Sequence, residues 1–291
     1  MKSLPFLNPA AGSPAVRNPE RPAVIVPTQA IDADQLAAEC HAAAATGIVD
    51  AIEWRVDPLL SGVSGAAQSG VQESAHTLAK AALRLLPSAL PAGLPILLTV
   101  RTGFEGGQVE ITEDDYAEVV RALIAGAAEV VAAGGDADSG LVDRADSGAQ
   151  AVPAAVDVEI DRVQSRGLIA SAREAGLPVV ASHHNFAATD SVDRLLATFT
   201  AMSEAGADIA KVAMMPQTPA DVLRLLEATT AADASLPASV LGISMGPLGR
   251  TSRIMGADFG SCATFAQIGA ASAPGQIDAV VLAGILDRIT G

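Results

Sequence analysis

Short apolar segments alternate with amphipathic helical patterns along nearly the whole chain, and this alternation limits the folds that it can adopt. The helical segments repeat apolar residues three or four positions apart, whereas the segments between them are short and almost wholly apolar. Apolar runs of this kind, each followed by a helix, are typical of parallel strands buried on both faces. Eight strands are expected, at residues 23–27, 49–56, 95–100, 155–160, 178–182, 208–214, 239–243 and 260–265.

Eight strand–helix units in about 270 residues predict a (β/α)8 barrel, the TIM barrel, in which a closed ring of parallel strands is surrounded by helices. An open, doubly wound sheet is the alternative. No GxGxxG sequence follows the first expected strand, which disfavours the dinucleotide-binding form of that sheet. Helices are expected at residues 32–46, 113–133, 162–175, 191–205, 219–231 and 277–290.

Two parts of the chain do not fit these repeating units. Residues 1–21 are rich in Pro, Asn and Ala, and we expect them to form an irregular N-terminal arm. Residues 134–150 contain four Asp and four Gly, which predicts a solvated, flexible insertion. Residues 22–291 are expected to form one barrel domain that contains this insertion.

The charge of the chain disfavours several classes of partner. A net charge of −15 and an isoelectric point near 4.5 disfavour binding to nucleic acids and to anionic membranes. The sequence has no apolar run long enough to span a bilayer, and residues 1–21 lack the apolar core of a secretory signal. Two isolated cysteines, Cys40 and Cys262, are typical of a reducing compartment, so we expect a cytoplasmic protein.

Lysine is rare in this chain, and one lysine lies in an unusual place. Of 18 basic residues only Lys2, Lys80 and Lys211 are lysines, and Lys211 lies inside an otherwise apolar strand. An apolar strand with a cation nearby, such as Arg101, Arg253 or a protonated His184, would favour the neutral amine, which can attack a carbonyl. The resulting imine acidifies the neighbouring carbon. A histidine could then remove that proton and later protonate a leaving group.

Other polar residues follow the expected strands at the end where barrel enzymes place their catalytic groups. Each also has a structural interpretation: Glu53 and Arg55 could form an ion pair that fills a barrel layer, and Lys211 could pair with Glu53 or Asp157. Burying so much charge is costly without a function. The strand-end residues are Glu53, Arg55 and Asp57, then Arg101, then Asp157 and Glu159, and finally His183 and His184.

The two adjacent histidines must point in opposite directions if they lie on a strand, so only one can face the barrel mouth. A strand-end histidine is often purely structural. The pair is also a weak candidate for metal binding, because the sequence has no His/Cys cluster with metal-ligand spacing. We therefore expect neither a metal nor a cofactor.

Two glycine-rich segments follow the last two expected strands, at residues 242–253 and 271–277. Loops in these positions often bind phosphate in barrel enzymes. Together with Arg253 they predict an anion site, for either a phosphate or a carboxylate. Pro274 and Gly275 predict a shaped turn that acts as a lid.

Six sequence motifs occur in the order and at the spacing of one known family. They cover the chain from about residue 22 to its end, and together they resemble type I 3-dehydroquinate dehydratase. The motifs are EWRVD at 53–57, RT at 101–102 with EGG at 105–107, SHHNF at 182–186, KVAMMP at 211–216, SMG at 244–246 with SR at 252–253, and ASAPGQ at 271–276.

The resemblance implies a homodimeric barrel of the Schiff-base, class I aldolase-like type, which converts 3-dehydroquinate to 3-dehydroshikimate in the shikimate pathway. It further implies that Lys211 forms an imine with the C3 ketone, that His184 is the general acid and base, and that Glu53 supports this histidine and the substrate hydroxyls. The implied substrate ligands are Arg55 and Arg101 for hydroxyls, and Arg253, Ser272 and Gln276 for the carboxylate.

One position departs from the family pattern, and two other functions remain open. Many members have Asp where this chain has Asn185, so we assign position 185 no essential charge. A class I aldolase shares the barrel and the lysine but normally needs a phosphate pocket. A catalytically silent relative is expected to lack Lys211 or His184, and this chain has both.

Overall fold

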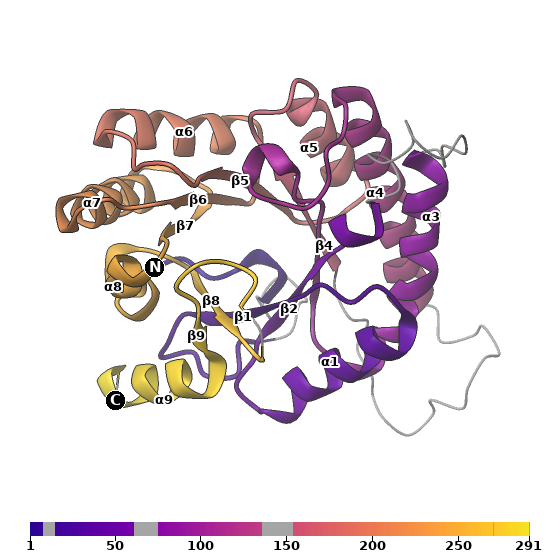
Figure 1. Cartoon of the computed structure of the whole chain (residues 1–291), viewed down its shortest axis with the longest axis horizontal. Coiled ribbons are helices and arrows are strands. Elements are labelled where there is room, and N and C mark those ends of the chain that lie inside the picture. Colours follow the sequence, from indigo (N-terminus) through magenta and orange to yellow (C-terminus); the bar gives the residue numbers. More distant parts are fainter. Residues whose placement is uncertain (8–14, 61–74, 136–153, 270, 291) are drawn as a thin grey trace.

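The computed structural model describes residues 1–7, 15–60, 75–135, 154–269 and 271–290. Within these residues, nine strands form one curled sheet in the order β7-β6-β5-β4-β3-β2-β1-β8-β9, and all neighbouring strands are parallel (Figure 1). The strands are β1 Ala23–Thr28, β2 Ala51–Arg55, β3 Ile96–Thr99, β4 Ala154–Glu159, β5 Val179–Asn185, β6 Ile209–Met214, β7 Ser239–Ser244, β8 Ala263–Gln267 and β9 Ile277–Asp278.

The sheet closes on itself between β7 and β8, which confirms the barrel. The closure is a single parallel bridge between Val240 and Ser261, and the amide of Cys262 donates to the carbonyl of Val240 at 2.9 Å. The eighth strand begins at Ala263 rather than at residue 260 as expected. Gly260 adopts the left-handed conformation (φ +98°) at the end of a short 3-10 turn, so the preceding chain cannot be extended.

Helices surround the barrel, as the apolar periodicity predicts (Figure 1). Local signals fix their starts: Asp32 and Ser191 cap α1 and α6 with their side chains, while Thr218 and Asp221 form a capping box on α7. The helices are α1 Ala33–Ala45, α3 Ala75–Leu85, α4 Glu113–Gly135, α5 Ser165–Glu174, α6 Val192–Glu204, α7 Pro219–Ser235, α8 Arg250–Ile254 and α9 Ala279–Thr290.

The core has an outer and an inner apolar layer. Strand side chains that point outward, such as Trp54 and Leu98, pack against the helices. Those that point inward, such as Leu97 and Leu241, fill the barrel. This alternation confirms that the strands are buried on both faces and leaves the polar positions for the ends of the strands.

Three of the first seven residues belong to this inner layer, although nothing in the sequence indicated that the expected irregular arm is buried. Leu4, Phe6 and Leu7 are at most 2% exposed and join the apolar cluster that fills the barrel. The hydroxyl of Ser239, at the start of β7, donates to the carbonyl of Ser3 at 2.9 Å. The arm therefore closes the barrel at the N-terminal ends of the strands. Residues 8–14, and residues 136–150 of the expected insertion, lie outside the described residues.

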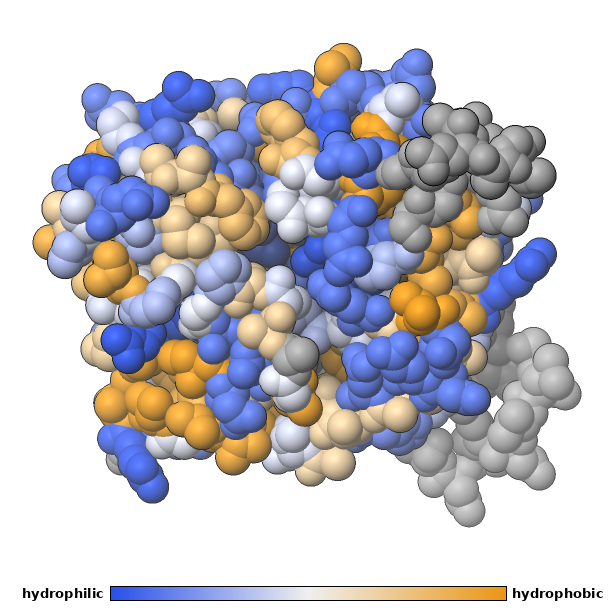
Figure 2. Space-filling model, viewed as in Figure 1, coloured by the Kyte–Doolittle hydropathy of each residue, from blue (hydrophilic) through white to orange (hydrophobic). Residues whose placement is uncertain are grey.

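Apolar side chains are also exposed on α9, where Val280, Val281 and Ile289 are each at least half exposed. Figure 2 shows apolar side chains gathered over this helix. None of the helices described in the structure is both long and apolar enough to cross a membrane.

Candidate active site

A cavity of about 240 Å³ opens among the C-terminal ends of the strands and the loops that follow them. Its position is the one where barrel enzymes place their active sites. The structure brings all eight predicted site residues to its wall: Glu53, Arg55, Arg101, His184, Lys211, Arg253, Ser272 and Gln276.

Lys211, on β6, is buried and lines this cavity. Its Nζ lies 3.4 Å from Oε1 of Glu53, 3.9 Å from Oδ2 of Asp157 and 4.2 Å from the centroid of the Phe265 ring. The closest charges are thus carboxylates, whereas the sequence suggested a neighbouring cation. Alternate strands of the barrel point inward at the same level, which places the acids of β2 and β4 in one layer with this lysine.

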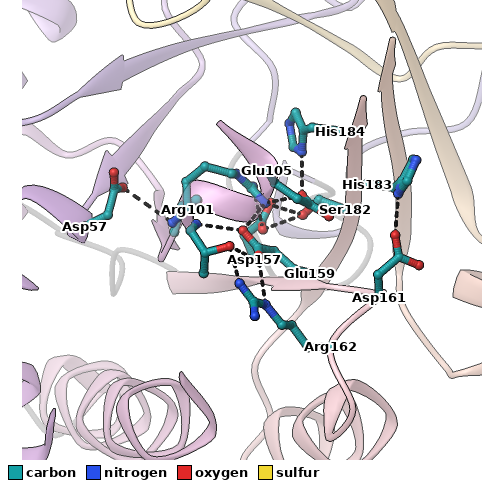
Figure 3. A network of polar contacts seen from close by, with 12 residues as sticks. Asp57, Arg101, Glu105, Asp157, Glu159, Asp161, Arg162, Ser182, His183 and His184 are labelled. Carbon is teal, nitrogen blue, oxygen red and sulfur yellow. Dashed lines mark hydrogen bonds and ion pairs between the residues drawn. The ribbon is translucent and has the colours of Figure 1, made fainter. Parts of the chain in front are cut away.

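His184 faces the same cavity and has an acidic partner that was not among the predicted site residues. Its Nδ1 lies 2.8 Å from Oε2 of Glu105 (Figure 3). Glu53, the expected support, contacts Lys211 instead. Burial, followed by the charges of Arg101 and Lys211, holds the pKa of His184 well below its usual value of 6.5. The imidazole is therefore neutral at pH 7 and able to accept a proton.

Glu105 reaches this position because of a tight turn after β3. The 3-10 turn Gly103–Glu105 ends at Gly106 with φ +79°, and a Cβ on Gly107 would lie 1.8 Å from the carbonyl oxygen of Arg101. Both glycines are therefore required for the chain to fold back. Glu105 is part of the EGG motif, which was the one sequence signal for it. Strand alternation cannot predict where its side chain points, because the residue lies on a turn.

His183 points to the opposite side of β5, as the alternation of a strand requires. Its Nδ1 lies 2.6 Å from Oδ2 of Asp161, and it does not line the cavity (Figure 3). The geometry therefore agrees with the choice of His184 as the histidine of the site.

Two of the three arginines in the cavity are neutralised by acids. Arg55 donates from Nε and Nη2 to both oxygens of Asp57, at 2.6 and 2.8 Å. Arg101 forms ion pairs of 2.7 to 3.1 Å with three buried acids, namely Glu105, Asp157 and Glu159. Their charges are compensated, so what they can offer a ligand is hydrogen bonds rather than net charge.

Arg253 differs from these two arginines because it has no carboxylate partner among the described residues. It is 2% exposed and donates to the backbone carbonyls of Phe265 and Pro274, at 3.1 and 3.0 Å. Its Nε has no partner within the described part of the chain. Burial lowers the pKa of Arg253 to about 10. A buried cation without a counter-ion is costly, so this part of the cavity is suited to an anion.

Ser272 and Gln276 lie beside Arg253 on the loop after β8. The amide of Ser272 donates to Oε1 of Gln276 at 2.8 Å, which closes the loop on itself. The loop is also tied to the rest of the cavity wall, because the carbonyl of Pro274 accepts from Arg253 and from the amide of Gly246.

The fold and the site define a (β/α)8-barrel enzyme with a buried lysine, a neutral histidine and an unpaired arginine around one cavity. The sequence model of the family described as type I 3-dehydroquinase matches residues 24–137 and 132–290. The chain belongs to the type I 3-dehydroquinase family, whose members are enzymes of the hydro-lyase class.

Individual relatives support this assignment. The 3-dehydroquinate dehydratase of Klebsiella pneumoniae is 34% identical over 270 residues, which cover 92% of this chain and 93% of the relative. That of Lactiplantibacillus plantarum is 36% identical over 230 residues, covering 78% and 77%.

Solved structures of the same family share the fold. The 3-dehydroquinate dehydratase of Geobacillus kaustophilus superimposes with a TM-score of 0.70 at 27% identity, covering 92% of this chain and 91% of that one. The type I enzyme of Clostridium difficile, solved with covalently modified comenic acid, gives 0.69 at 28% identity, covering 93% and 92%.

Proposed function

We propose that this enzyme removes water from 3-dehydroquinate to give 3-dehydroshikimate, through an imine between Lys211 and the C3 ketone of the substrate. The observation that carries the proposal is the convergence of Lys211, the neutral His184 and the unpaired Arg253 on one cavity. A ketone, an acidic C–H bond and a carboxylate on one small molecule would use all three groups.

The lysine must lose a proton before its nitrogen can attack the ketone. Glu53 is the nearest carboxylate, 3.4 Å from Nζ, and we assign it the role of accepting that proton. Addition of the amine followed by loss of the ketone oxygen as water gives the imine. The imine then withdraws electrons from the neighbouring carbon and makes its proton acidic.

His184 removes this proton from the carbon and then donates a proton to the leaving hydroxyl group. The pair of electrons left on the carbon forms the new double bond and expels a hydroxyl group, which His184 protonates so that it leaves as water. Hydrolysis of the imine releases the product and restores Lys211. Glu105, at 2.8 Å from Nδ1, fixes the orientation of the ring during both transfers.

The arginine without an acidic partner and the two arginines paired with acids bind different groups of the substrate. Arg253 binds the carboxylate through its guanidinium fork, with Ser272 and Gln276 as further hydrogen-bonding groups. Arg55 and Arg101, already paired with acids, donate to the substrate hydroxyls. No described contact indicates a phosphate site. Lys211 and His184, of which a silent relative would lack at least one, both face the cavity.

Addition of 3-dehydroquinate while ultraviolet absorbance is followed tests the proposal directly. Dehydration yields a conjugated enone, so absorbance should rise with the wild type and with Lys80→Ala, which removes a lysine outside the cavity. It should stay flat with Lys211→Ala. No rise with the wild type at any pH between 6 and 9 would exclude the dehydratase function.

On the basis of the family resemblance we further propose that the protein is a homodimer acting in the shikimate pathway. Sedimentation equilibrium at micromolar concentration measures the assembly. A mass equal to one chain would contradict the dimer without affecting the proposed chemistry.

A further inference from the structure

Glu105 has one oxygen whose environment the proposed mechanism does not explain. Its Oε2 contacts His184 and Arg101, but its Oε1 is buried and has no hydrogen-bond partner among the residues that the structure describes. The residue as a whole is 1% exposed. A buried carboxylate oxygen without a partner is costly, so a polar group is expected to serve it.

The Asp161–His183 pair lies close to the carboxylate of Glu105. One oxygen of Glu105, one oxygen of Asp161 and one ring nitrogen of His183 lie within 4.8 Å of one another. Two hydrogen bonds of about 2.8 Å each reach across such a gap, so one water molecule can bridge all three groups. Three polar partners are the number that a buried water typically has.

We propose that His183 is a positioning residue, which with Asp161 and one bridging water supplies a hydrogen-bond donor to the second oxygen of Glu105. The structure gives a contact between the half-exposed Asp161 and His183 and another between Glu105 and His184, and the proposed water would connect the two pairs. The inference rests on the proposed function, because it gives His184 the role of the base.

The donor matters because the ionisation of Glu105 sets the tautomer of His184. An ionised Glu105 can only accept, so the proton of the neutral ring lies on Nδ1 and Nε2 is free to take a proton from the substrate. A protonated Glu105 would donate to Nδ1 and leave the proton of the ring on Nε2, where it blocks that transfer. Burial, reinforced by Glu159 and Asp157, raises the pKa of Glu105, so each added donor favours the active tautomer.

The groups around His183 come from several elements. Asp161 follows β4, and Glu105 lies on the turn after β3. The pKa of Asp161 is lowered by its hydrogen bond with His183 and, to a smaller extent, by the charge of Arg194 on α6. His184 follows His183 on β5 but faces inward, toward the cavity that Lys211 also lines. Removal of His183 should therefore act on the reaction through Glu105 rather than through the substrate.

Three variants separate this role from simple packing. His183→Leu removes the donor and keeps the volume, and it should lower kcat about tenfold at pH 7 with little change in KM. Its acid limb in kcat against pH should move to higher pH, because Glu105 becomes easier to protonate. His183→Gln keeps an N–H donor and should recover most of kcat. His41→Leu, an exposed histidine on α1, is the control and should match the wild type.

Nitrogen-15 NMR of the His184 ring gives a second measurement that does not depend on turnover. The wild type should show the Nδ1–H tautomer near pH 7, and His183→Leu should shift the population toward Nε2–H. Wild-type pH limbs together with an unchanged tautomer in a folded His183→Leu protein would overturn the inference. Loss of wild-type activity on chelation would also overturn it, because the three groups would then hold a metal ion. Absence of turnover in the wild type, with the tautomer shift present, would count against the proposed function alone.

Discussion

Nζ of Lys211 lies 3.4 Å from Oε1 of Glu53, inside the barrel and away from solvent. The two residues come from β6 and β2, on opposite sides of the ring, so only a closed barrel brings them together. In the proposed mechanism, Glu53 is therefore the carboxylate placed to accept the proton of this amine, in the same layer of the barrel. That assignment leaves His184 for the proton of the substrate.

We expect borohydride, added with 3-dehydroquinate, to trap a substrate-derived mass on Lys211 only. Peptide mass spectrometry would locate it. Lys80, on α3, serves as the internal reference because the same digest reports both lysines. An adduct on Lys80, or an active enzyme with no adduct at all, would be incompatible with the imine.

Substitution of Glu53 and of Glu105 should slow different steps of the reaction. Glu53→Gln should slow formation of the trapped adduct, since the amine loses its proton acceptor. Glu105→Gln should leave adduct formation near wild type and lower kcat by roughly 10²-fold or more, because the ring is no longer held as a base. Rapid-quench mass spectrometry separates the two steps, and Glu118→Gln, a half-exposed residue on α4, is the control. If both substitutions slowed adduct formation and the later step to the same extent, Glu53 and Glu105 would not have the separate roles assigned to them.

His184 should remain neutral well into the acidic range. Its pKa is lowered by burial and then by nearby cations, so the ring keeps its lone pair as the pH falls through 6.5 and gains a proton only below that value. An NMR titration of the ring measures this, with the exposed His41 as the reference signal. Arg55→Met removes one of those cations and should raise the pKa of His184. Protonation of His184 above pH 6.5 in the wild type would contradict the lowered pKa of this ring.

Arg253→Lys should raise KM about 10- to 100-fold with a smaller effect on kcat. A lysine retains the charge but not the planar fork, and a hydrogen bond to a charged group contributes about 1.5–3 kcal/mol. Arg250→Lys, an exposed arginine at the start of the same short helix, should leave the kinetics unchanged. Unchanged KM in Arg253→Lys would place the carboxylate elsewhere.

The loop at residues 272–276 should exchange its amide hydrogens more slowly when substrate is bound. In the structure it is held by contacts to Pro274 and within the loop itself, and a carboxylate on Arg253, Ser272 and Gln276 would add further contacts. Hydrogen exchange with and without ligand measures the difference. Equal protection in the two states would indicate a fixed wall rather than a lid.

The sequence was sufficient to predict the barrel and the membership of the cavity, because both follow from strand alternation and from motif order. It was not sufficient to assign partners within the cavity. Glu105 lies on a turn whose direction depends on two glycines, and the neighbours of Lys211 depend on the register of the strands. The burial of Leu4 and Phe6 could not be anticipated either, since their partners are distant in the chain.

The arm that closes the barrel is synthesised first but can take its final place only after nearly the whole chain has been made. Lys2 donates to the carbonyls of Leu236 and Ala238, which are 234 and 236 positions further along the chain. The ribosome synthesises the arm first and its partners 234 to 236 residues later, roughly 10 to 50 s at about 5–20 residues per second. The arm therefore remains unpaired until β7 has emerged. Contacts with so large a separation in sequence form late in folding. A nascent chain stalled before residue 236 should therefore leave the arm open to proteases, whereas the finished protein should protect it.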